Sequence, residues 1–223
     1  MLYIIPTPIG NLKDLTFRAL EVLQAVDSII CEDTRRASLL LNHYQIKKPL
    51  LVLNDFNESK THQNILARLK NEEDFALISD AGTPLISDPG YKLVRECLAN
   101  NIKVDSLPGP VSPIVALTLS GLPPDKFTFL GFLPDKSGHR QKVYDGIKKI
   151  NEEFKNTYII FLSPYKFDKT FTELKENFGN INITLAKELT KIYHSVETKK
   201  ISEWETFYKK QKPKGEYILL LNF

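Results

Sequence analysis

Cysteine and histidine are scarce in this 223-residue chain, and neither occurs in a metal-binding pattern. The two cysteines, Cys31 and Cys97, each lie in an apolar or amphipathic run, which is typical of small buried thiols. The four histidines are scattered, and none stands with Cys, Asp or Glu at the spacing of a metal site. The sequence therefore disfavours a disulfide scaffold and predicts no structural metal.

Long apolar runs are also absent. No stretch approaches the length that crosses a membrane, and the chain does not begin with a basic segment, an apolar run and a cleavage site. We therefore expect a cytoplasmic protein with no membrane partner. Apolar residues make up 42% and charged residues 26%, as in ordinary globular proteins. The formal net charge of +3 permits an anionic partner such as RNA without requiring one.

Several catalytic signatures are missing as well. The chain has no G-x-x-x-x-G-K-[ST] phosphate loop and no G-x-G-x-x-G sequence, which disfavours ATP hydrolysis and the usual dinucleotide fold. It also lacks a G-x-S-x-G elbow and an H-E-x-x-H helix. Nothing therefore indicates a hydrolytic nucleophile or a zinc protease.

The chain does contain one recurring local pattern, a short apolar strand followed by a loop rich in glycine and proline and then a helix. Such loops span residues 6–11, 80–84 and 108–113. In a parallel sheet the carboxyl ends of the strands meet at one edge, so the three loops should lie together. Glycine lets the backbone approach a ligand closely, and proline fixes its path. This edge is the predicted ligand crevice.

The stretch that contains the second of these loops, residues 79–90, carries two aspartates with different expected roles. Asp88 precedes Pro89 and an apolar helical series, so we predict that Asp88 caps the helix and Pro89 opens it. Asp80 follows a predicted strand and precedes Gly82, where open α/β sheets place ligand contacts. A turn-forming side chain stays open as the alternative for Asp80.

The pattern changes after a stretch rich in glycine and proline at residues 120–125. We therefore predict two domains, residues 1–120, which carry the ligand crevice, and residues 121–223. The predicted fold class is α/β. It has a mostly parallel sheet in the first domain and a smaller mixed sheet in the second.

Five segments, taken in this order, resemble the tetrapyrrole methylase superfamily. They are LYIIPTPIGNL at residues 2–12, CEDTR at 31–35, SDAGTPLISDPG at 79–90, LPGP at 107–110 and GFLP at 131–134. More narrowly, they are similar to the ribosomal branch of that superfamily, which 2′-O-methylates a cytidine ribose of small-subunit ribosomal RNA. The resemblance implies a homodimer of two-domain α/β chains.

The resemblance also implies S-adenosylmethionine as the cofactor, bound in the cleft between the two domains. Carried over position by position, it implies cofactor contacts from both halves of the chain, many of them through main-chain groups. In the first half these are Pro8, Ile9, Asp80, Gly82, Thr83, Val111 and Ser112, and in the second half they are Phe161, Leu162, Ser163 and Ala186.

The implied reaction moves a methyl group to a ribose hydroxyl, so the protein must position the reactants and accept the hydroxyl proton. We expect the catalytic groups among polar residues beyond the strand ends, namely Asp33, Arg35, Asn57 and Glu58. Ordinary alternatives stay open for two of them. Arg35 with Arg36 is equally typical of a solvated pair at a helix start, and Glu58 of a first-turn carboxylate.

Basic residues of the second half predict contacts with the implied partner, small-subunit ribosomal RNA or the 30S subunit, although a solvated face is the ordinary alternative. One group is Lys136, Arg140, Lys142, Lys148 and Lys149; a second is Lys199, Lys200, Lys209, Lys210, Lys212 and Lys214.

The chain departs from the ribosomal branch in three places. Residues 54–58 have Asn and Phe where that branch commonly shows His, and residues 163–167 lack its acidic residue before Pro and its Arg after it. The chain also stops at Phe223, without the small helical extension typical of the branch. Because these differences concern the substrate, two alternatives stay open. One is a methylase of a small molecule such as a tetrapyrrole or corrinoid precursor, and the other is a non-catalytic S-adenosylmethionine-binding protein.

Overall fold

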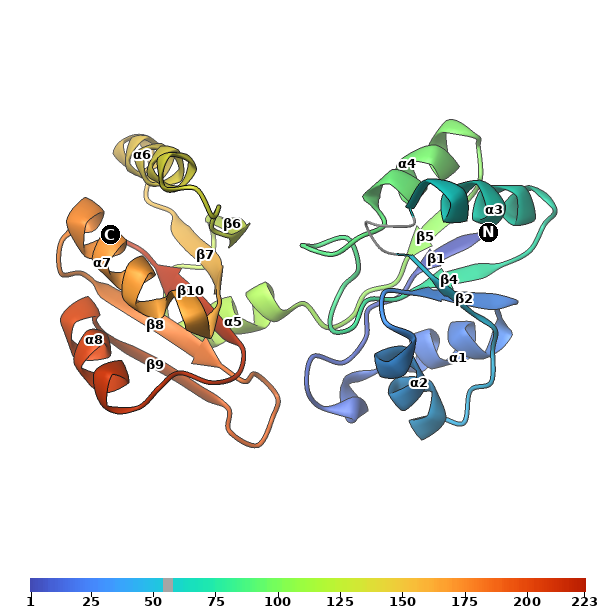
Figure 1. Ribbon diagram of the computed structural model, residues 1–223, viewed down its shortest axis with the longest axis horizontal. Coiled ribbons are helices and arrows are strands. Elements are labelled where there is room, and N and C mark those ends of the chain that lie inside the picture. The colour runs from blue at the N-terminus through green and yellow to red at the C-terminus, as the bar shows by residue number, and fades with distance from the viewer. Residues whose placement is uncertain (54–57) are drawn as a thin grey trace. The chain divides into compact units, whose positions relative to one another are not determined.

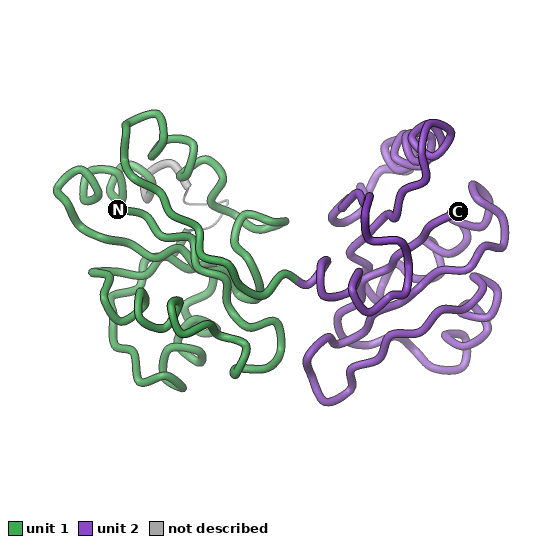
Figure 2. The backbone as a smooth tube through the Cα atoms, turned by 180° about the vertical axis from the view of Figure 1, so that it is seen from behind, with its two compact units in different colours: residues 1–111 green, residues 112–223 purple. Residues whose placement is uncertain are grey.

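The computed structural model describes residues 1–53 and 58–223, without the side chains of residues 58–61. The chain divides into two compact units, Met1–Val111 and Ser112–Phe223 (Figure 2). This division comes earlier than the boundary predicted after residue 120. The reason is that helix α5 (Ser112–Ser120) packs against strands of the second sheet and so belongs to the second unit.

A five-stranded parallel sheet forms the centre of the first unit (Figure 1). The strands are β1 (Leu2–Ile4), β2 (Ser28–Cys31), β3 (Leu50–Val52), β4 (Phe75–Leu77) and β5 (Val104–Ser106). Their order across the sheet is β3-β2-β4-β1-β5, and every neighbouring pair is parallel. The carboxyl ends of all the strands therefore lie at one edge, as the sequence predicts.

Helices cover both faces of this sheet, because a parallel sheet must bury both of them. One face carries α1 (Phe17–Ala25) and α2 (Thr34–His43), and the other carries α3 (Glu58–Lys70) and α4 (Tyr91–Ala99) (Figure 1). A short 3-10 helix, η1 (Leu12–Asp14), precedes α1. Cys31 and Cys97 are buried, free thiols in the cores of opposite faces.

The second unit is built on a mixed sheet of the order β6-β7-β10-β8-β9. Its strands are β6 (Phe127–Phe132), β7 (Thr157–Leu162), β8 (Asn182–Lys187), β9 (Ser195–Lys200) and β10 (Tyr217–Leu221). Only β6 and β7 form a parallel pair, while β10 and β9 pair antiparallel to their neighbours. The sheet is mixed as predicted, but with five strands it equals the first sheet rather than being smaller.

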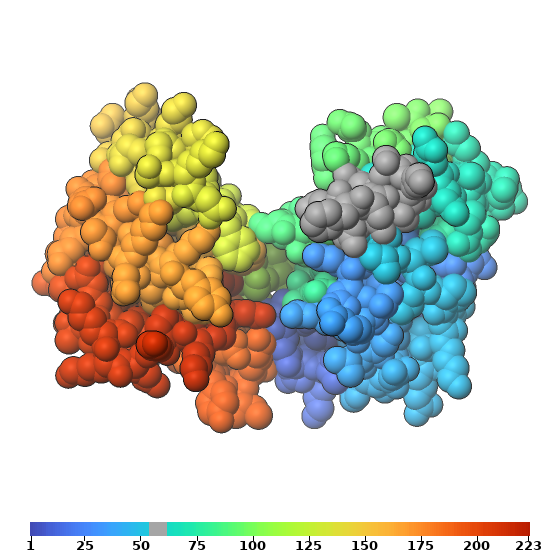
Figure 3. Space-filling model, in the orientation of Figure 1, coloured from blue at the N-terminus to red at the C-terminus, as the bar shows by residue number. Residues whose placement is uncertain are grey.

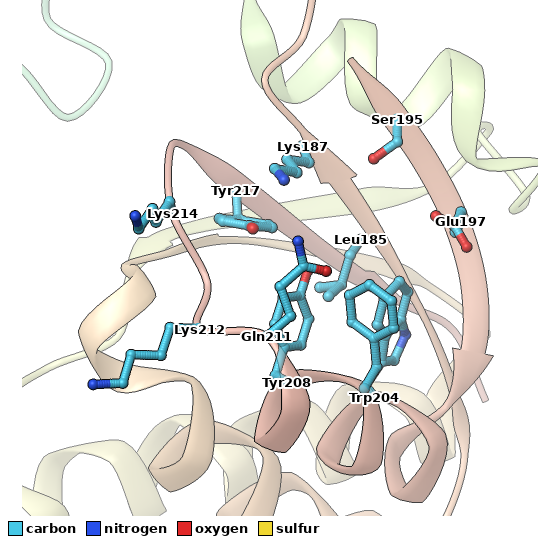
Figure 4. A pocket seen from close by; sticks show the side chains of 11 residues that line it. Leu185, Lys187, Ser195, Glu197, Trp204, Tyr208, Gln211, Lys212, Lys214 and Tyr217 are labelled. Atoms are coloured by element: carbon cyan, nitrogen blue, oxygen red, sulfur yellow. The ribbon is translucent and has the colours of Figure 1, made fainter. Parts of the chain in front are cut away.

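Three long helices cover one face of the second sheet. They are α6 (Ser137–Glu153), α7 (Phe167–Phe178), which follows the 3-10 helix η2 (Pro164–Lys166), and α8 (Ile201–Lys210). Their core with the sheet is rich in aromatic side chains, including Tyr144, Phe171 and Trp204. Helix α5 lies on the other face (Figures 1 and 4). The turn between β8 and β9 projects from the rest of the unit in orange (Figure 3).

The helix after the central loop begins later than predicted. Helix α4 starts at Tyr91, its N-cap is Gly90, and no side chain caps it. The prediction that Asp88 caps this helix and Pro89 opens it is therefore wrong. Gly90 has a φ of +117° and Ser87 a φ of +68°. These left-handed residues on either side of Asp88 bend the chain, so the aspartate lies half-buried in the loop instead of at a helix end.

Every helix within residues 1–53 and 58–223 is too short or too polar to cross a membrane.

Replacing Gly90 with Ala should destabilise the protein. A Cβ at this position would lie 2.8 Å from Cδ2 of Leu77 and 2.9 Å from Cδ2 of Leu85, on a backbone that disfavours any L side chain. We expect a loss of about 2 kcal/mol in the free energy of unfolding, measured by urea denaturation. The matched control is Gly146→Ala, since Gly146 lies within α6 with open space around it. That variant should gain about 0.5 kcal/mol. Equal effects at the two positions would contradict this account.

Candidate functional site

Three loops leave the carboxyl edge of the parallel sheet in the first unit. Residues 5–11 follow β1, residues 78–90 follow β4, and residues 107–111 follow β5. Because β1 lies between β4 and β5, the three loops are neighbours, which confirms that they share one edge. This is the edge where open α/β sheets bind ligands.

A pair of main-chain hydrogen bonds joins the first two loops. The N–H of Thr7 donates to the carbonyl of Gly82 at 2.9 Å, and the N–H of Gly82 donates to the carbonyl of Thr7 at 3.0 Å. The buried hydroxyl of Thr7 donates to the carbonyl of Ser79, and the hydroxyl of Ser79 donates to the carbonyl of Gly82, both at 3.1 Å. These bonds fix the loop, and they also occupy the main-chain groups of Gly82 that the sequence suggested for a ligand.

Gly82 also lets the three loops approach one another closely. Its φ is +86°, and a Cβ there would lie 3.3 Å from Cγ2 of Ile9 and 3.7 Å from the carbonyl oxygen of Pro110. The hydroxyl of Thr83 donates to that same carbonyl at 2.9 Å. Ile9, Gly82 and Thr83, which the resemblance assigns to the cofactor, are thus brought together in the first unit.

Unused donors flank Gly82. Across the described part of the chain, the main-chain N–H groups of Ala81 and Thr83 donate to no main-chain carbonyl. Ala81 is exposed and Thr83 is half-buried, so these groups lie at the surface of the edge. Two free donors beside a tightly held glycine can bind the acceptor groups of a ligand.

Acidic side chains gather beside these donors, at the end of β2 and in the central loop. Burial raises the pKa of Asp88 to about 6, the hydroxyl of Ser79 opposes this rise, and the negative charges of Glu32 and Asp80 add to it. Burial also raises the pKa of Asp80, and this rise is opposed mainly by Arg36, whose Nε lies 3.4 Å from the Asp80 carboxylate. The edge therefore carries negative charge that favours a cationic ligand group.

Asp33 differs from Asp88, although both lie in this acidic group. It is the N-cap of α2 and accepts a hydrogen bond from the main-chain N–H of Arg35 at 2.9 Å. The guanidinium of Arg35 also binds the carboxylate, with a shortest distance of 2.6 Å. These hydrogen bonds to Arg35 lower the pKa of Asp33 to about 2. Asp33 is therefore a weak proton acceptor, whereas Asp88 is a better one near neutral pH.

The remaining predicted residues of the first half lie in different places. Pro8 is half-buried in the first loop, next to Ile9. Val111 ends the first unit and Ser112 opens helix α5 of the second. Asn57 lies outside the described residues, and Glu58 begins α3 with its side chain outside the description.

In the second unit, three residues form a row across neighbouring strands. Ile218 of β10 pairs with Phe161 of β7 on one side and with Ala186 of β8 on the other. The predicted residues Phe161 and Ala186 thus share one face of the sheet, and Ser163 follows at the end of β7. Leu162 points to the opposite face, where it is buried in the helix-covered core. Only its main chain can contact a ligand on the Phe161 face.

The sequence did not indicate that Ile218, Asp88 and Thr7 lie among the predicted site residues, where the structure places them. The apolar strand at residues 217–221 gives no register by itself, so Ile218 could not be paired with the two predicted residues. Thr7 could have been found, because it is a polar residue between two prolines in an apolar stretch, a pattern that suggests a buried hydrogen bond. In the described ranges, no three His, Cys, Asp or Glu side chains are grouped closely enough to hold a metal ion.

Comparison with known proteins gives consistent results. Residues 1–204 match the family described as Tetrapyrrole (Corrin/Porphyrin) Methylases. A Thermotoga maritima protein named Ribosomal RNA small subunit methyltransferase I is 43% identical over 221 residues, covering 99% of this chain and 97% of the relative. A protein of the same name from Escherichia coli O157:H7 is 44% identical over 223 residues, covering 99% of this chain and 77% of the relative.

A solved structure shares the fold at low sequence identity. A diphthine synthase is 13% identical with a TM-score of 0.76, covering 99% of this chain and 88% of that chain. At this identity the likeness shows the fold alone.

Proposed function

This chain belongs to the tetrapyrrole methylase family, and we propose that it uses S-adenosylmethionine to 2′-O-methylate a cytidine ribose of small-subunit ribosomal RNA. The observation that carries the proposal is the 43% sequence identity, over 99% of the chain, to a relative named Ribosomal RNA small subunit methyltransferase I. The shared name favours an RNA substrate over a small molecule. The ribose position and the cytidine rest on the resemblance of the sequence motifs.

The edge of the first unit fits the proposed cofactor. S-adenosylmethionine supplies a methyl group on a positively charged sulfur. The carboxylates of Asp80 and Asp88 favour that charge, and the free N–H groups of Ala81 and Thr83 offer hydrogen bonds to its polar atoms. Gly82 keeps this surface open, because a side chain there would meet Ile9. We therefore keep Pro8, Val111 and Ser112, which lie in or beside the same loops, as proposed contacts.

The second unit offers further proposed contacts on one face of its sheet. Phe161 and Ala186 share that face with Ile218, and we add Ile218 to the proposed set. Ser163 lies at the end of the same strand as Phe161. Leu162 would contribute through its main chain, because its side chain belongs to the core on the other face.

We assign the removal of the ribose hydroxyl proton to Asp88. A catalytic base works best when its pKa lies near the working pH, and the pKa of Asp88 is raised to about 6. Asp33, whose pKa is near 2, instead caps α2 and orients the guanidinium of Arg35. The side chain of Arg35 is 88% exposed and can also meet an RNA phosphate. Asn57 and Glu58 stay candidates for orienting the nucleotide.

The proposed setting is a homodimer acting in the cytoplasm on the 30S subunit or its RNA. Support for the dimer comes from the family resemblance, and support for the location comes from the proposed RNA substrate. Analytical ultracentrifugation of the purified chain measures its oligomeric state directly.

Methyl transfer to RNA tests the proposed function. Purified protein is incubated with tritiated S-adenosylmethionine and either 30S subunits or naked small-subunit RNA from a strain lacking the modification. We expect label on one ribose, located by primer extension at low nucleotide concentration. A reaction without protein and one with large-subunit RNA are the controls. No label above background in any small-subunit substrate would refute the proposal.

The pH dependence of the reaction tests the role of Asp88. Its carboxyl is protonated below its pKa, so kcat/KM should fall tenfold per pH unit below about 6 and level off above it. Asp88→Asn should lower kcat by about 10²-fold or more at every pH and remove this limb. The control is Asp33→Asn, which should keep the limb near pH 6. If Asp88→Asn retained the wild-type profile, another group would be the base.

A further inference from the structure

A pocket of about 200 Å³ opens in the second unit, between strands β8 and β9 and helix α8. Its lining includes Lys187 and Tyr217 from the sheet, and Gln211, Lys212 and Lys214 from the segment that joins α8 to β10 (Figure 4). The predicted site residues of this unit do not line it. The pocket therefore needs an explanation of its own.

The pocket and the proposed cofactor residues lie on opposite faces of the sheet. Tyr217 pairs with Lys187, and the next residues along, Ile218 and Ala186, pair with each other. Successive side chains in a strand point to opposite faces, so Tyr217 and Lys187 face away from the side that carries Ile218 and Ala186. A ligand in the pocket thus cannot touch the side chains of Phe161, Ile218 or Ala186.

A buried hydroxyl in the pocket lacks a hydrogen-bond partner. Tyr217 is 3% exposed, and within the described ranges its hydroxyl forms no hydrogen bond. Its neighbour Tyr208 keeps a neutral phenol, because burial raises the pKa of Tyr208 well above its ordinary value. A buried hydroxyl without a partner costs stability, so a ligand that accepts its hydrogen bond would remove that cost.

The charges of the pocket lining favour an anion. Lys187, Lys212 and Lys214 form no ion pair with any described residue, and Nζ of Lys187 lies 5.7 Å from the centroid of the Tyr217 ring. The acidic side chain in the lining, Glu197, already pairs with Lys199. The pocket lining thus combines unpaired ammonium groups with the Tyr217 hydroxyl and the amide of Gln211.

We propose that this pocket binds a backbone phosphate of the RNA substrate. The inference rests on the proposed function, and it adds a substrate contact on a face separate from the cofactor residues. A phosphate accepts hydrogen bonds from Tyr217 and Gln211 while the lysines supply charge. The basic sequence continues past the pocket through Lys209 and Lys210, as an extended polyanion requires and a small free anion does not.

Two double variants with the same change in net charge test the proposal. Lys212→Gln/Lys214→Gln alters the pocket lining, while Lys47→Gln/Lys48→Gln alters two lysines that precede β3 in the first unit and do not line the pocket. Affinity for a fluorescent small-subunit RNA fragment is measured by anisotropy at several salt concentrations. We expect the pocket variant to bind at least fivefold more weakly than the control variant and to lose about one unit of salt slope. Equal affinities for the two variants would overturn the proposal.

Tyr217→Phe separates ligand binding from structural support. Because the hydroxyl has no partner in the protein, its removal should leave the unfolding temperature unchanged or raise it, yet weaken RNA binding. A lower unfolding temperature together with unchanged RNA affinity would mean that the hydroxyl serves the fold, which contradicts the proposal.

Inorganic phosphate distinguishes the source of the anion. It is titrated against the RNA complex at constant ionic strength, with chloride as the balancing salt. Displacement of RNA only at millimolar phosphate supports an RNA backbone site. Tight phosphate binding that leaves RNA affinity unchanged would contradict it.

Calorimetry with S-adenosylmethionine should give the wild-type affinity for both double variants. Failure of the wild-type protein to methylate RNA would refute the proposed function, whereas the comparison of the double variants judges the pocket alone.

Discussion

The pair of hydrogen bonds between Thr7 and Gly82 is the interaction on which the first unit's site depends. These bonds tie the loop after β1 to the loop after β4, and the hydroxyls of Thr7 and Ser79 reinforce them. Because Gly82 is held in this way, its neighbours Ala81 and Thr83 keep unused N–H groups at the edge of the sheet. Gly82 thus supports the proposed binding surface, and Ala81 and Thr83 are proposed to form that surface.

The acidic residues at this edge are separated by their surroundings. Asp33 and Asp88 carry the same side chain, yet hydrogen bonds to Arg35 lower the pKa of Asp33 to about 2, while burial raises the pKa of Asp88 to about 6. Opposite environments acting on like groups assign different roles to them. Asp33 is a helix cap and the partner of an arginine, whereas Asp88 is a half-buried carboxyl with a higher pKa.

Much of the fold could be predicted because short apolar strands, Gly/Pro loops and helices follow one another regularly. The parallel sheet of the first unit and the shared edge of its loops follow from that order. The position of Asp88 within the loop, rather than at the helix end, could not be predicted. The left-handed backbone of Ser87 and Gly90 delays the start of α4 to Tyr91. Ile218 was missed because register between strands distant in sequence is set by packing, and α5 was misplaced because its contacts with the second sheet are long-range.

The central claim is that the loop held by Thr7 and Gly82 presents its flanking N–H groups to the cofactor. Titration of ¹⁵N-labelled protein with S-adenosylmethionine, followed by amide chemical shifts, tests this claim most directly. The account predicts that the amides of Ala81 and Thr83 are among those that shift most. Saturation of the protein with cofactor while both amides stay unshifted would contradict it.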